Sequence, residues 1–211
     1  MPSGRSFILA LITMVAFGGL LGGCASSPQG TAQRTDGFAF RARPPLPLDA
    51  ADLMPGLAVL YFKHAFVRSL DALPQGDEAR ARGWTGPPIT ELNHQFGRGA
   101  IFDSDTNRGI ALELDGYIRL AQPGTYFFQA NSNDGIRMYI GSQLLIDDPD
   151  WHSDRLTPET QLTIRQPGWY SLRLRYFQRK GTASLQLYWK PPGQGQFSIV
   201  PSKELAHQPA A

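Results

Sequence analysis

From Gly56 onward, short runs of alternating apolar and polar residues follow one another, separated by turn residues. In such a run successive side chains point to opposite faces of a strand, so one face can meet a core while the other meets water. The clearest runs cover residues 126–130, 136–140, 172–176 and 185–189. Short alternating strands at close spacing are typical of a β-sandwich or barrel. The pattern therefore predicts an all-β domain.

Two kinds of turn join the expected strands. Gly141-Ser142 separates the runs 136–140 and 143–146, which predicts a hairpin with a two-residue turn. The tripeptide Gln-Pro-Gly occurs at 122–124 and again at 166–168, each time before a new strand. Proline presets the turn and glycine tolerates a positive φ, so both tripeptides predict corners between strands. We expect them to be equivalent corners of two packed sheets.

The first 23 residues have the layout of a secretory signal peptide. Arg5 precedes an uncharged apolar run over 7–21, and Gly22-Gly23 lead to Cys24. The run is shorter than the roughly 20 residues that cross a bilayer as a helix. Cys24 is the only cysteine, and the segment before it resembles the lipobox of bacterial lipoproteins. The resemblance implies that Cys24 carries acyl chains, whereas the alternative is an ordinary cleaved signal with an incidental cysteine.

An acylated Cys24 would hold the mature protein at a membrane of the bacterial envelope, because two acyl chains anchor a protein stably. Ala25 lacks the aspartate that implies inner-membrane retention in enteric-type lipoproteins, so the resemblance favours the outer membrane. The stretch after Cys24 is poor in apolar residues and rich in Ser and Pro, which predicts a flexible spacer. The alternative is a strand between Gly37 and Ala42 that docks on the domain.

The expected organisation therefore has four parts. They are a signal peptide over 1–23, the lipidated cysteine and spacer over 24–53, a β-sandwich over 54–205 and a tail over 206–211. With a single cysteine the chain forms no internal disulfide, so the core must stabilise the fold. The formal charge of +2 and 18% charged residues give no nucleic-acid footprint, since such proteins carry a strong basic excess.

Residues for catalysis form no recognisable motif, and we interpret the chain as a non-enzyme. There is no Gly-x-Ser-x-Gly sequence. The four histidines have no zinc-ligand spacing; they are His64, His94, His152 and His207. A glycan hydrolase with paired carboxylates is the remaining catalytic alternative, for which Glu91, Glu113 and Asp115 are available.

A succession of short motifs indicates a family. In chain order they are Gly56-Leu57, Leu114-Asp-Gly-Tyr-Ile118, Pro123-Gly-Thr-Tyr-Phe127, Ser132-Asn-Asp-Gly-Ile-Arg-Met-Tyr-Ile140, Trp151, Pro167-Gly-Trp-Tyr170, Arg175-Tyr-Phe177 and Leu187-Tyr-Trp-Lys-Pro191. Together they resemble the PA14 domain, a β-sandwich module of bacterial toxins, glycosidases and cell-surface adhesins. The resemblance implies a PA14-like antiparallel β-sandwich over roughly 54–205 and, in many members, carbohydrate binding.

In a subset of PA14 adhesins the resemblance also implies a calcium ion that bridges protein and sugar. That subset uses two adjacent aspartates joined by a cis peptide, and the matching positions here are Asn133 and Asp134. An amide in place of a carboxylate lowers the negative charge of the site and hence its expected affinity for calcium. We therefore expect a weak calcium site at most, and no cofactor that the protein requires. The alternative is that Asn133-Asp134-Gly135 forms a tight turn without a metal.

The segment 147–154 is a second candidate, since it gathers four carboxylates around Trp151 and His152. In the functional interpretation, Trp151 presents a flat face to a sugar ring while Asp150 or Asp154 accepts hydrogen bonds from hydroxyls. In the structural interpretation, which we favour for Trp151, the tryptophan is core, the carboxylates are solvated and His152 has no role.

A basic set follows the same part of the chain, comprising Arg165, Arg173, Arg175, Arg179 and Lys180. Such residues suit anionic glycans through charge-assisted hydrogen bonds, but we favour a solvated sheet face. The leading hypothesis is an envelope-anchored module that recognises glycan with loops at one end of the sandwich, through Asn133, Asp134, Asp150, Trp151 and Asp154. The alternative is a structural or assembly lipoprotein that binds another envelope protein.

Overall fold

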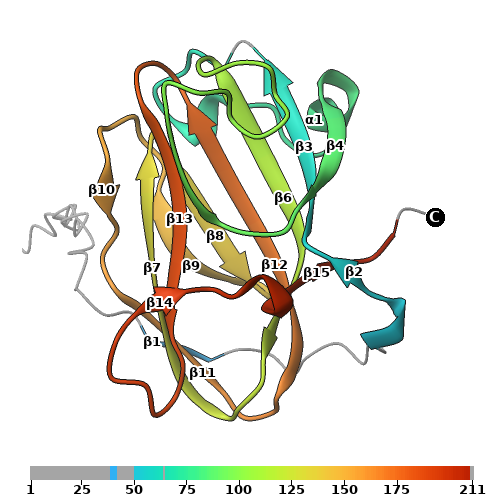
Figure 1. Cartoon of the computed structure of the whole chain (residues 1–211), viewed down its shortest axis with the longest axis vertical. Helices are drawn as coiled ribbons and strands as arrows, with labels where there is room; N and C mark the ends of the chain where they lie inside the picture. The colour runs from blue at the N-terminus through green and yellow to red at the C-terminus, as the bar shows by residue number, and fades with distance from the viewer. Residues whose placement is uncertain (1–38, 42–49, 64, 210–211) are drawn as a thin grey trace, which may run out of the picture. The chain divides into compact units, whose positions relative to one another are not determined.

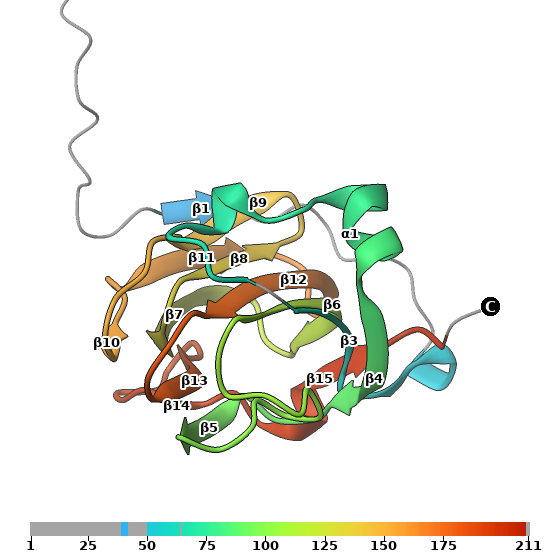
Figure 2. The same cartoon turned by 90° about the horizontal axis from the view of Figure 1, so that it is seen from above.

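The computed structural model describes residues 39–41, 50–63 and 65–209. Cys24, the signal peptide and most of the predicted spacer lie outside these residues. The described part consists mostly of β-strands in two sheets, which confirms the prediction of an all-β antiparallel sandwich. Figure 1 shows the strands of both sheets, and Figure 2 shows them from above.

The first sheet has the strand order β1-β11-β7-β13-β14, with β10 beside β7 and β5 beside β13. Its strands are β1 (Ala39–Arg41), β5 (Asn93–Gly97), β7 (Gly124–Asn133), β10 (Arg155–Leu156), β11 (Thr160–Ile164), β13 (Ala183–Lys190) and β14 (Ser198–Ile199). β1 is parallel to β11, whereas the other pairs are antiparallel. The position of β1 agrees with the alternative of a strand between Gly37 and Ala42.

The second sheet has the order β2-β15-β6-β12-β8-β9, with β3 and β4 attached beside β6. Its strands are β2 (Met54–Pro55), β3 (Leu57–Lys63), β4 (Trp84–Ile89), β6 (Ile110–Leu120), β8 (Ile136–Ile140), β9 (Gln143–Asp148), β12 (Gly168–Gln178) and β15 (Leu205–His207). Its strand pairs are all antiparallel. The main helix is α1 (Gly76–Arg82), and the short 3-10 helices are η1 (Ala50–Asp52), η2 (Leu70–Ala72) and η3 (Ser202–Glu204).

The alternating residues of the sequence build the core between the sheets. Phe128 of β7, Met138 of β8, Leu174 of β12 and Leu187 of β13 are each fully buried there. Burying one such side chain stabilises the fold by about 1.5–3 kcal/mol relative to leaving it in water. The polar residues between them point outward, so the two-residue period explains which face of each strand is covered.

Both predicted kinds of turn are confirmed. Ile140 of β8 pairs with Gln143 of β9 across Gly141, whose φ of +61° favours glycine. The two Gln-Pro-Gly corners carry the chain between sheets, from β6 to β7 and from β11 to β12. At the first corner the Tyr126 hydroxyl accepts a bond from the backbone N–H of Gln122 at 3.0 Å. At the second, the Tyr170 hydroxyl donates to the carbonyl of Gln166. The corners are therefore equivalent.

A second apolar cluster lies on the outer face of the β3-β6-β12 sheet and was not predicted. Leu70 and Ala79, from η2 and α1, pack there against Phe62 and Phe177. Arg175 lies close by, only 8% exposed, and its Nη2 donates to the carbonyl of Pro74 at 2.7 Å. Burial lowers the pKa of this guanidinium. The prediction that the whole basic set is solvated is therefore wrong for Arg175, because the segment containing η2 and α1 covers it.

Among the residues that the structure describes, no helix is long and apolar enough to cross a membrane.

Candidate functional site

Several strands end or begin at the same end of the sandwich. The end of β12 lies beside the start of β6 (Gln178 with Ile110), the start of β8 lies beside the end of β9 (Ile136 with Asp148), and the end of β7 lies beside β13 (Asn133 with Ser184). We call this the Asp134 end; its loops are residues 65–69, 133–135, 149–154 and 179–182, toward the top of Figure 1.

Asp134 connects three of these loops. Its side chain is buried, with the residue 3% exposed. One carboxylate oxygen accepts a bond from the backbone N–H of His152 at 3.1 Å, and the other accepts one from the backbone N–H of Arg179 at 2.6 Å. Burial raises the pKa of Asp134, while these two N–H groups oppose the rise. The carboxylate thus fixes the 149–154 loop against the end of β12.

Backbone contacts hold the same turn against β12. The N–H of Asp134 donates to the carbonyl of Phe177 at 3.0 Å, and the N–H of Phe177 donates to the carbonyl of Gly135 at 3.1 Å. The peptide between Asn133 and Asp134 is cis. A Cβ on Gly135 would lie 2.4 Å from the carbonyl oxygen of Pro149 and 2.7 Å from Cε1 of Phe177. Only glycine fits this position without displacing its neighbours.

Asn133 joins the turn to the far side of the 149–154 loop. Its side-chain amide donates to Oδ1 of Asp154 at 2.6 Å, and its carbonyl accepts a bond from the hydroxyl of Tyr176. Complete burial raises the pKa of Tyr176 well above its ordinary value, so the phenol stays a donor. The structure therefore brings the predicted residues Asn133, Asp134 and Asp154 together. Within residues 39–41, 50–63 and 65–209, no three acidic, His or Cys side chains are grouped so that they could hold a metal ion.

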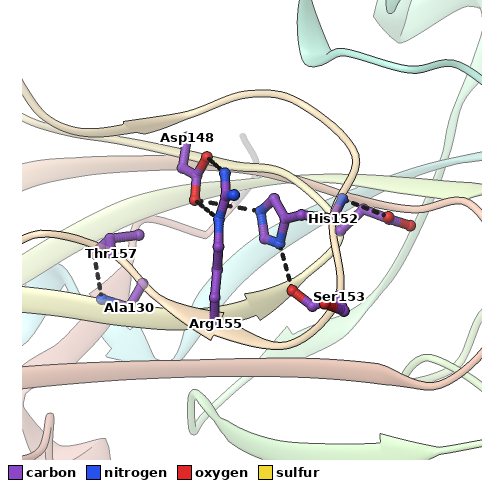
Figure 3. A network of polar contacts seen from close by, with 7 residues as sticks. Ala130, Asp148, His152, Ser153, Arg155 and Thr157 are labelled. Carbon is purple, nitrogen blue, oxygen red and sulfur yellow. Dashed lines mark hydrogen bonds and ion pairs between the residues drawn. The ribbon is translucent and has the colours of Figure 1, made fainter.

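His152 belongs to a polar network under the loop, shown in Figure 3. Arg155 makes a bidentate contact with the buried Asp148, with its Nε at 2.9 Å from Oδ2. The imidazole Nε2 of His152 lies 3.3 Å from the same oxygen, at ion-pair distance without the alignment of a hydrogen bond. Its Nδ1 lies 2.7 Å from the carbonyl of Ser153. The interpretation of solvated carboxylates and an incidental His152 is therefore wrong for Asp148 and His152.

Trp151 is 52% exposed, so the prediction that it is a core residue is wrong. Asp150 pairs with Ser69, and the backbone N–H of Trp151 donates to the carbonyl of Arg68 at 2.9 Å. These contacts hold the segment on the rim, outside the space between the sheets. The indole ring lies 5.7 Å from the Arg68 guanidinium carbon and 5.5 Å from that of Arg179. Such cation–π contacts steady an exposed ring.

The Asp134 end also contains exposed apolar residues that the sequence did not indicate. Among the described residues, the large exposed apolar side chains are Met54, Phe66, Trp151 and Leu156. Phe66 lies next to Gly109 and follows the end of β3, while Leu156 pairs with Asn131 near the end of β7. Three of the four therefore lie at the Asp134 end, and exposed apolar groups concentrated on one surface are typical of a binding site.

The carboxylates considered for hydrolysis lie elsewhere. Glu113 and Asp115 are two residues apart on β6 and face a groove of about 640 Å³ beneath α1, which Leu60 and Arg80 also line. Asp147 lies on the outer face as well, where Arg137 binds it at 2.7 Å. Glu113 and Asp115 are therefore separate from the loops of the Asp134 end, whereas Asp147 lies at the end of β9, directly before Asp148 and the 149–154 loop.

Comparisons with known proteins agree with this architecture. A family model described as the PA14 domain matches residues 55–203. A curated relative, anti-sigma-I factor RsgI3 of Acetivibrio thermocellus, is 27% identical over 115 residues, which is 54% of this chain but only 17% of the relative. The chain therefore spans about a sixth of that protein's length.

Two solved structures share the fold. The PA14 domain of the antifreeze protein MpAFP superposes with a TM-score of 0.58 at 17% identity, covering 81% of this chain and all of that one (100%). The Epithelial Adhesin 9 A domain from Candida glabrata, solved in complex with Galb1-3GlcNAc, has a TM-score of 0.60 at 12% identity and covers 80% and 96%. At these identities the likeness shows the fold alone.

Proposed function

Because the chain belongs to the PA14 domain family, we propose that it is a carbohydrate-binding module of the bacterial envelope that recognises glycan with the loops of the Asp134 end. The adhesin domain of the same fold was solved with a disaccharide. Binding rather than catalysis also fits the residues, since the site contains polar and aromatic groups without a nucleophile motif.

Trp151 is the observation that carries this proposal. A half-exposed indole is an apolar platform for the face of a sugar ring, and its bonds to neighbouring loops hold it in place before the ligand arrives. Polar groups near the platform supply orientation. Asn133 and Asp154 are already hydrogen-bonded to each other, while Asp150, which directly precedes Trp151, is exposed. We propose these three residues as partners for sugar hydroxyls.

Calcium is not needed for the proposed glycan binding. Both oxygens of Asp134 already accept backbone N–H bonds, and the amide nitrogen of Asn133 is engaged by Asp154. The aromatic platform contacts a sugar directly, so binding is expected to persist without the ion. A weak calcium site at Asn133 and Asp134 would add affinity rather than create it.

Membrane anchoring through Cys24 is the second part of the proposal. The sequence before Cys24 supports it, and a tethered module gains effective concentration toward ligands near its own membrane. Labelling of cells with an alkyne fatty acid should mark the wild-type protein and not Cys24→Ala. Label retained on Cys24→Ala would contradict lipidation there, and fractionation of the labelled protein would report the inner or outer membrane.

A glycan array on the chain without residues 1–23 tests the binding function. Trp151→Ala should weaken binding about tenfold, since an aromatic stacking contact contributes on the order of 0.5–1.5 kcal/mol beyond the area that it buries. Met54→Ala is the matched control, because Met54 is equally exposed, at 52%, away from the Asp134 end. No binding to any glycan would overturn the proposal. A stoichiometric envelope protein that co-purifies in a Trp151-dependent manner would instead favour the protein-binding alternative.

A further inference from the structure

The guanidinium groups of Arg68 and Arg179 retain unused hydrogen-bond donors, and the charge of Arg179 also acts on the buried Asp134 carboxylate. Their guanidinium groups lie beside the Trp151 ring, at 5.7 Å and 5.5 Å from its centroid. Neither side chain forms a hydrogen bond or ion pair with any residue that the structure describes. The Nε of Arg179 is buried without a partner. Two sets of strong donors therefore stand beside the exposed ring with their hydrogen-bonding capacity unused.

Three carboxylates of the same end are, by contrast, already hydrogen-bonded. Asp134 accepts two backbone N–H bonds, Asp148 binds Arg155, and Asp154 accepts the amide of Asn133. The pKa of Arg155 is raised by its hydrogen bond to Asp148, with a smaller contribution from the charge of Asp150, which places Asp150 near Arg155. Apart from the exposed Asp150, the carboxylates of this end therefore have occupied acceptors, whereas the guanidinium donors beside Trp151 do not have partners among the described residues.

We infer that the glycan bound at this site is acidic: a pyranose that packs against the exposed part of the Trp151 indole while its anionic group binds Arg68 and Arg179. This inference rests on the proposed function and adds the ligand class. A guanidinium offers a planar fork of N–H donors that matches the two oxygens of a carboxylate, or two oxygens of a sulfate. Holding both forks against the indole places them within reach of a substituent on a stacked ring.

Arg173 provides a matched control for this arrangement. Its guanidinium carbon lies 5.5 Å from the Tyr139 ring, so it makes the same kind of contact on the outer face of the second sheet. It stands opposite Asp115 in the β12–β6 register, where a carboxylate is available. Removal of Arg173 therefore changes the net charge as much as removal of Arg68, without touching the proposed site.

An array of paired glycans tests the inference. Each pair holds an acidic glycan and its neutral counterpart: oligogalacturonate with its carboxyl-reduced form, sialylated with desialylated lactose, and sulfated with unsulfated galactan. The acidic member should bind about tenfold or more tightly, as expected for charge-assisted hydrogen bonds. The carboxylate and sulfate pairs distinguish which anionic group is preferred.

Arg68→Gln and Arg179→Gln should each reduce binding of the acidic member about tenfold. Arg173→Gln should bind it as tightly as the wild type does. Arg68 is exposed, so its variant keeps the fold even if Arg179→Gln perturbs it. Equal binding of both members, or a preference for neutral ones, would overturn the inference while the proposed function stands. No binding of any member would overturn both.

Discussion

Removal of the Asp134 carboxylate should loosen the Asp134 end and weaken the whole fold. In Asp134→Ala, the backbone N–H groups of His152 and Arg179 lose their acceptor, at 3.1 Å and 2.6 Å in the native protein. An unsatisfied buried donor costs about 1–3 kcal/mol, so two cost about 2–6 kcal/mol of unfolding free energy. Two loops then lose the bond that joins them, and Trp151 loses its fixed position.

Urea unfolding of the chain without residues 1–23, followed by tryptophan fluorescence, measures this cost. With a slope of about 2 kcal/mol per molar urea, the midpoint should fall by roughly 1–3 M. Asp77→Ala is the control, because the Asp77 side chain is fully exposed in α1 and its ion pair with Arg80, at 3.0 Å, lies on the surface; its midpoint should not move. A midpoint for Asp134→Ala that equals the wild-type value, with the same slope, would refute the structural role of this carboxylate.

Three other outcomes are expected. Gly135→Ala should lower the unfolding free energy by about 1–3 kcal/mol or more in the same urea assay, because its Cβ would lie 2.4 Å from the carbonyl oxygen of Pro149; an unchanged midpoint would contradict the close approach. Burial raises the pKa of Asp134 in the folded protein. Protonation of Asp134 therefore stabilises the native state fully below the unfolded pKa of about 4, and this stabilisation is lost as the pH rises through the folded pKa. The Tm of the wild type minus that of Asp134→Asn should therefore fall as the pH rises above about 4, and a rising difference would contradict the assigned direction. Glycan binding should persist in a chelator, and a loss that only calcium restores would make the ion essential.

The strand pattern was predictable because it depends on local chemistry. Alternation along 126–130 and 136–140 places one face of each strand in the core, and this period holds in β7 and β8. The Gln-Pro-Gly corners were predictable for the same reason, since proline and glycine restrict the turn by themselves. The family motifs then added the resemblance to a PA14-like antiparallel β-sandwich.

The binding surface was predictable only in part. Asn133, Asp134 and Asp154 were predicted as binding residues; in the structure the amide of Asn133 donates to Asp154, and the role of the three in binding stays a prediction. Arg68 and Phe66 gave no signal, because they reach Trp151 and Gly109 through contacts between segments far apart in the chain.

Burial of single side chains was the least predictable feature. Trp151 is a large aromatic residue of the kind found in cores, but its backbone segment is held on the rim by contacts with Arg68 and Ser69. Arg175 has the alternation of a solvated strand residue but lies beneath the segment of η2 and α1. In both cases the exposure of the side chain depends on a segment far away in the sequence, so the local pattern of residues does not predict it.

The central claim is that glycan binds at the Asp134 end, and the NMR signals of the four tryptophans in the chain test it most directly. Titration with the best glycan from the array should shift the indole N–H of Trp151, together with the backbone amides of His152 and Arg179. The indole signals of Trp84, Trp169 and Trp189 should stay in place, since these residues lie on other strands. Shifts at Trp169 or Trp84, with Trp151 unmoved at saturation, would contradict the account.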